Sequence, residues 1–69
     1  MEPELLEILR EAVETRQRKE ELERSIGRAL RRHELDFKIY VKMTSELREM
    51  TEREGISFED AARRVLSQQ

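Results

Sequence analysis

Cysteine and tryptophan are absent from this chain of 69 residues, which also has only one proline, one histidine and two glycines. Without cysteine there is neither a disulfide nor a thiolate zinc site, and the lone histidine, His33, excludes a two-histidine zinc site within one chain. No apolar run approaches the length of about 18 residues that crosses a bilayer. We therefore expect a cytoplasmic protein with no membrane partner, no metal and no cofactor.

Large apolar side chains are scarce, whereas charges are abundant: the hydrophobic residues make up 36% of the chain and the charged residues 43%. The 14 basic and 16 acidic residues give a net charge of −2, which does not favour a general nucleic-acid binder. The sequence has no cysteine nucleophile and no glycine-rich phosphate loop. We expect one non-enzymatic domain without a small-molecule substrate, which gains stability from helices and self-association.

Residues 3–33 are predicted to form one long helix. Apolar residues recur there at helical spacing in two clusters, first Leu5, Leu9 and Ala12 and then Leu22, Ile26, Ala29 and Leu30. The stretch 14–21 between the clusters has no apolar residue, so it is either a solvated part of the helix or a junction between two helices. Because it lacks Gly, Pro, Asn and Asp, we favour the continuous helix. Gly27 indicates a place where another helix comes close.

The next segment, 34–43, fits two templates. From Leu35 to Met43 apolar and polar side chains alternate with a period of two, which is typical of a strand. Tyr40, Met43, Leu47 and Met50 also follow a helical 3-4-3 spacing. Periodicity alone leaves both structures open, and we favour the strand because Ile, Tyr and Val are strong β-formers.

The last third of the chain has clear helix signals. Residues 45–54 are predicted to be helical, and Gly55 is expected to end that helix in the left-handed conformation. Ser57 is then expected to cap a final helix over residues 58–68.

The segment Phe37–Leu66 resembles the ribbon-helix-helix family of repressors and antitoxins. The matching parts are the alternating stretch Phe37–Val41, the helix residues Leu47 and Met50, and the run Gly55–Leu66. The resemblance implies an intertwined homodimer, in which two strands pair into an antiparallel ribbon that enters the DNA major groove. The expected fold is mainly α, with a long N-terminal helix, a short strand-like segment and a helix-turn-helix pair. An all-α three-helix dimer is the alternative.

The resemblance also implies which side chains would contact DNA and which would form the dimer core. If the first helix starts at Thr44 or Ser45, the outward side chains contact DNA: Lys38, Tyr40 and Lys42. A basic cluster just before the ribbon is a candidate for phosphate contact: Arg28, Arg31 and Arg32. The predicted dimer core consists of Leu5, Leu9, Ile26, Leu30, Phe37, Ile39, Val41, Met43, Leu47, Met50, Val65 and Leu66.

Two functions remain open at this point. One is a dimeric DNA-binding repressor or antitoxin, with residues 34–69 as the ribbon-helix-helix-like module and residues 1–33 as an arm for dimerisation or for a second protein. The other is a non-enzymatic helical homo-oligomer that acts as a scaffold, adaptor or inhibitor of another protein. The backbone conformation of residues 37–43 distinguishes them.

Overall fold

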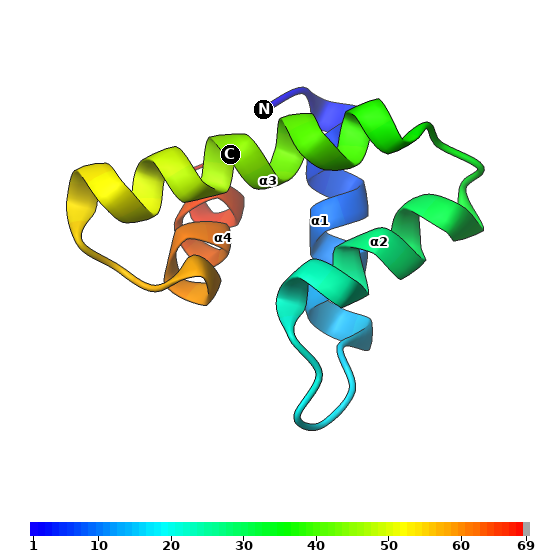
Figure 1. The fold of residues 1–69 in the computed structure, drawn as a ribbon, viewed down its shortest axis with the longest axis horizontal. Coiled ribbons are helices and arrows are strands. Elements are labelled where there is room, and N and C mark those ends of the chain that lie inside the picture. Colours follow the sequence, from blue (N-terminus) through cyan, green and yellow to red (C-terminus); the bar gives the residue numbers. More distant parts are fainter. Residues whose placement is uncertain (69) are drawn as a thin grey trace.

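The computed structural model describes residues 1–68, and helices joined by loops are its only regular secondary structure over that range (Figure 1). Its helices are α1 (Pro3–Thr15), α2 (Leu22–Arg32), α3 (Phe37–Glu54) and α4 (Phe58–Ser67). No strand is present among residues 1–68. The mainly helical class is therefore confirmed. The predicted strand-like ribbon is wrong, and with it the strand pairing that would have intertwined two copies.

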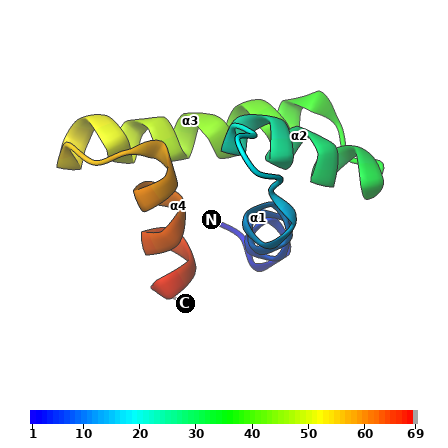
Figure 2. The ribbon, with the colours of Figure 1, turned by 90° about the horizontal axis from the view of Figure 1, so that it is seen from below.

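The longest helix, α3, spans the molecule, and α2 and α4 pack beside it. In Figure 1, α2 runs below the first half of α3 in the opposite direction, and α4 lies below the second half. Seen from below in Figure 2, α1 and α4 project from the same side of α3. Helix α1 contacts both α2 and α4, so a single core joins the two ends of the chain.

The predicted continuous helix over residues 3–33 is divided in two. Helix α1 ends at Thr15, where Arg16 turns to an extended conformation, and Lys19 takes a positive φ of 67° within the connecting loop. The alternative interpretation of the polar stretch 14–21, a junction between two helices, is therefore correct. The physical reason is burial: a straight helix would leave both apolar clusters in water, whereas the reversal packs α2 against α1.

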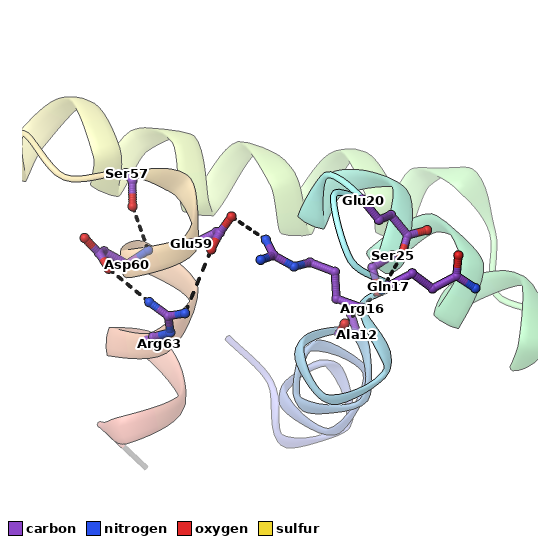
Figure 3. A network of polar contacts seen from close by, with 9 residues as sticks. All are labelled: Ala12, Arg16, Gln17, Glu20, Ser25, Ser57, Glu59, Asp60 and Arg63. Atoms are coloured by element: carbon purple, nitrogen blue, oxygen red, sulfur yellow. Dashed lines mark hydrogen bonds and ion pairs between the residues drawn. The ribbon is translucent and has the colours of Figure 1, made fainter.

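Polar side chains of α2 satisfy carbonyl groups at the end of α1. The Ser25 hydroxyl, which is fully buried, donates to the Ala12 carbonyl oxygen at 2.6 Å (Figure 3). The Arg28 guanidinium donates to the Thr15 carbonyl oxygen at 2.9 Å. Because the last four carbonyls of a helix have no partner within the helix, these bonds stabilise the end of α1 and fix α2 beside it.

Helix α3 begins at Phe37, inside the segment predicted as a strand. The Asp36 carboxylate accepts a hydrogen bond from the Lys38 backbone N–H at 2.9 Å and so caps the helix. Leu35 and Tyr40 occupy the staple positions around that cap. The residues that are buried therefore follow the helical 3-4-3 spacing and not the period of two. Met43 and Leu47 are buried, whereas Phe37 and Val41 are exposed.

The link between α2 and α3 is a Schellman motif without glycine. The Leu35 N–H bonds the Leu30 carbonyl at 2.9 Å, and the Glu34 N–H bonds the Arg31 carbonyl at 3.1 Å. Glu34 has a φ of 55°, in the left-handed region that favours glycine. This four-residue link turns the chain back, so α2 and α3 form a helical hairpin (Figures 1 and 2).

The C-terminal predictions are confirmed within residues 1–68. Gly55 ends α3 with φ 65° and ψ 36°. The Ser57 hydroxyl accepts a hydrogen bond from the Asp60 N–H at 3.0 Å and caps α4 (Figure 3). An ion pair between Arg16 and Glu59 then ties α4 to the end of α1 (Figure 3).

One chain forms an apolar core from all four helices. The buried apolar residues are Leu5, Ile8, Leu9, Ala12, Leu22, Ile26, Ala29, Leu30, Met43, Leu47, Ala61 and Ala62. Half of the predicted dimer core lies here, and Ile39, Met50, Val65 and Leu66 pack against it partly buried. Residues 1–33, predicted as an arm, thus contribute most of this core. Among the described residues, no helix is both long and apolar enough to cross a bilayer.

We predict that Glu34→Gly stabilises the fold, because glycine relieves the left-handed backbone without removing any ion pair formed by the described residues. The expected gain is about 0.5–1 kcal/mol in the free energy of unfolding, measured by urea denaturation. Glu34→Ala retains the Cβ and should give no gain. Equal stabilisation by both substitutions would contradict the assigned conformation of the link.

Candidate functional site

A groove of about 410 Å³ lies between α2 and the first turns of α3. Its lining residues are Glu23, Arg24, Gly27, Leu30, Arg31, Leu35, Asp36, Phe37 and Tyr40. The capped start of α3 and the Schellman link place these residues together. The groove therefore depends on the same two features that turned the predicted strand into a helix.

Two stacked aromatic rings form one wall of the groove. The ring centroids of Phe37 and Tyr40 are 5.4 Å apart, and the ring planes differ by 21°. Tyr40 is half-buried over Gly27, whereas Phe37 is 72% exposed and Val41, one turn further along α3, is 46% exposed. These two are the large apolar side chains that remain exposed among residues 1–68. An aromatic side chain left in water beside a groove is typical of a surface that binds another molecule.

Gly27 makes room for the groove. A Cβ added at this position would meet the Cε1 atom of Tyr40 at 3.8 Å, which is ordinary van der Waals contact. At Gly27, where the close approach of another helix was predicted, α3 makes only this ordinary contact through the Tyr40 side chain. On a different face of α2, Ser25 bonds α1.

The charged groups at the groove differ in whether they have partners. The Glu23 carboxylate lies 3.7 Å from the Arg48 guanidinium, and the Asp36 carboxylate caps α3. Arg24 and Arg31 form no ion pair within 4 Å in the described part of the chain. The groove consequently presents two guanidinium groups on α2 that have no ion pair in that part of the chain, next to apolar side chains.

Several of the residues predicted to contact nucleic acid have partners within the chain. Arg28 pairs with Glu20 and bonds Thr15, so it holds the turn between α1 and α2. Arg32 lies 3.4 Å from Glu11. Tyr40 stacks on Phe37 inside the groove.

The two predicted lysines also differ in their surroundings. The Lys42 ammonium bonds Glu2 at 3.0 Å, and this carboxylate raises the pKa of Lys42. Lys38 is exposed, and its side chain has no ion pair among residues 1–68. Of the six predicted residues, Arg31 and Lys38 therefore keep free charges.

His33 has a structural partner. Its Nε2 atom lies 3.0 Å from a Glu11 carboxylate oxygen, and this hydrogen bond lowers the pKa of Glu11. The contact joins the end of α2 to α1. Within residues 1–68, no group of three or more His, Asp or Glu side chains is placed to hold a metal ion.

Comparison of this chain with protein-family models, curated proteins and solved structures gave no match. Function is therefore inferred from the geometry of the groove. Sequence reasoning missed Arg24 and Leu35 as residues of this site. The available signal was Asp36, a good capping residue directly before Phe37, which would have placed the start of a helix there.

We predict that Gly27→Ala stabilises α2, because alanine is favoured over glycine inside a helix and its Cβ fits against Tyr40. The free energy of unfolding should rise by about 0.5–1 kcal/mol in urea denaturation. A loss of stability would mean that α2 and α3 lie closer together than described.

We also predict a specific acid dependence of stability. The pKa of Glu20 is lowered because its carboxylate accepts hydrogen bonds from Arg28 and from the Gln17 backbone N–H. This stabilisation is complete above the unfolded-state pKa and is lost as the pH falls through the lower folded-state pKa. The Glu20→Gln variant should therefore lose less stability than the parent chain on acidification below the usual glutamate range. Urea titrations at several pH values measure this.

The matched control for that experiment is Glu52→Gln, because Glu52 is exposed and has no ion pair within residues 1–68. It should keep the acid dependence of the parent chain. If Glu20→Gln behaves like this control, the hydrogen bonds of Glu20 do not stabilise the turn.

Proposed function

We propose that this protein is a non-enzymatic protein-binding module of adaptor or inhibitor type, whose α2–α3 groove receives a helical segment of another protein. The observation that carries the proposal is the stacked pair Phe37–Tyr40, with Phe37 72% exposed at the edge of the groove. Aromatic residues beside a groove are the usual anchors of protein–protein interfaces.

The shape of the groove supports a helical occupant. Two helices that run in opposite directions form its sides, and a third helix seated between them would extend a helical layer (Figure 1). Grooves of this kind bind amphipathic helices through apolar residues at i, i+3, i+4 and i+7. The missing side chain at Gly27 leaves space for such an anchor.

The residues of the groove give less support to catalysis. No histidine, serine, cysteine or lysine lines it, so the commonest nucleophiles and general bases are missing from its lining. Both lining carboxylates, Glu23 and Asp36, already have partners. Binding therefore accounts for the groove better than a chemical step does.

DNA binding also has less support than protein binding. The helix-turn-helix of DNA-binding proteins crosses its two helices at about 90–120° and presents the second helix to the major groove. Here α2 and α3, the helices that carry all the predicted DNA contacts, instead run antiparallel to each other (Figures 1 and 2). Arg28, Arg32 and Lys42 are paired with carboxylates of the same chain.

The test is selection of helical peptides from a displayed library on the immobilised chain. We expect selected peptides to bind the parent chain at least about tenfold more tightly than Phe37→Glu, because loss of an aromatic anchor costs more than about 1.4 kcal/mol. The substitution should change the free energy of unfolding by less than about 1 kcal/mol, since Phe37 is exposed.

Ser45→Glu is the matched control, because it adds the same charge at an exposed position two turns further along α3. It should bind the selected peptides within about twofold of the parent chain. If no selected peptide distinguishes Phe37→Glu from the parent chain, the groove is not a peptide-binding site.

A further inference from the structure

The charges around the groove define which helix it accepts, and this inference rests on the proposed function. Arg24 and Arg31 lie seven residues apart on α2, about two helical turns or 10 Å. Both line the groove, and neither has an ion pair within 4 Å among residues 1–68. On the α3 side, Lys38 follows Phe37 and is likewise exposed without an ion pair in that range.

Guanidinium groups without an ion pair on the α2 side of the groove favour an anionic occupant. Burying guanidinium groups next to a neutral or basic helix would remove water from them without providing an acceptor. Carboxylates of a bound segment supply acceptors in charge-assisted hydrogen bonds, for which the planar guanidinium is well suited. The two lining acids already face positive groups of this chain, because Glu23 pairs with Arg48 and Asp36 lies at the positive end of the α3 dipole.

A second copy of this chain fits the groove less well. The buried apolar residues of every helix already face the core, and the large apolar side chains left exposed within residues 1–68 are Phe37 and Val41 themselves. A symmetric contact across that face would bring the groove-lining Arg24 and Arg31 of both copies into one interface. Like charges at the contact oppose such a dimer.

We infer that the partner of the groove is an acidic amphipathic helix. Its large apolar residues would rest on Gly27, Phe37 and Tyr40. Two of its carboxylates, about two turns apart, would face Arg24 and Arg31.

The experiment compares two displayed helical libraries that share one apolar pattern and differ in their polar positions, which are glutamate-rich in one and lysine-rich in the other. Both are selected on the parent chain and counter-selected on Phe37→Ser, which removes the ring without adding a charge. The acidic library should give at least about ten times more Phe37-dependent binders. Their affinity should fall about three- to tenfold between low and high salt, because exposed charge pairs are screened.

Charge reversal supplies an independent check. Arg24→Glu and Arg31→Glu should each weaken the selected acidic peptides about three- to tenfold. The double variant should instead prefer the lysine-rich library. Arg18→Glu, an exposed cation in the α1–α2 loop outside the groove, is the control and should leave the affinity within about twofold of the parent chain.

The outcomes separate this inference from the proposed function. Equal numbers of Phe37-dependent binders from both libraries would overturn the acidic preference and leave the peptide-binding groove intact. No Phe37-dependent binder from either library would overturn the proposed function itself. A dimer in sedimentation that Phe37→Glu dissociates would identify a second copy as the occupant. Salt-sensitive binding of duplex DNA that is lost in Arg24→Glu and Arg31→Glu would identify nucleic acid instead. Either of these last results overturns the inference.

Discussion

The reversal between α1 and α2 is the constraint on which the rest of this structure depends. A chain with 36% hydrophobic residues has too few large apolar side chains to leave a helical face unpaired. Folding α2 back on α1 lets two narrow apolar stripes bury each other. The cost is a helix end whose carbonyls have lost their partners, and Ser25 and Arg28 of α2 satisfy two of them. The packing of α2 on α1 also sets the position of the link from which α3 begins.

The groove is a consequence of that arrangement. Once α2 is held against α1, the Schellman link at Glu34 returns the chain along α2, and the Asp36 cap starts α3 at once. The first turn of α3 extends past the core, so Phe37 is exposed while Tyr40 covers Gly27. The apolar and charged parts of the groove come from different elements: the rings belong to α3, and the two free guanidinium groups belong to α2.

Signals that act through one residue were predictable from the sequence, and signals that depend on packing were not. Gly55 and Ser57 fix their own backbone environment, and both were assigned correctly. The left-handed position after α2 is occupied by Glu34 and not by glycine, so the sequence did not indicate where α2 ends. Residues 37–43 satisfied both periodicities, and only the core, which takes Met43 and Leu47, decides for the helix. For the site, the sequence indicated Tyr40, Arg31 and Gly27 separately but not their meeting in one groove.

The most direct test of this account is a nuclear Overhauser measurement on the isotope-labelled chain, directed at the contact between α2 and α3. We expect cross-peaks between the ring protons of Tyr40 and the α-protons of Gly27, because the Cε1 atom of that ring lies 3.8 Å from where a Cβ of Gly27 would stand. If Tyr40 shows no contact with Gly27, and residues 37–43 instead give the cross-strand α-proton contacts of a paired ribbon, then the groove does not exist and the account is wrong.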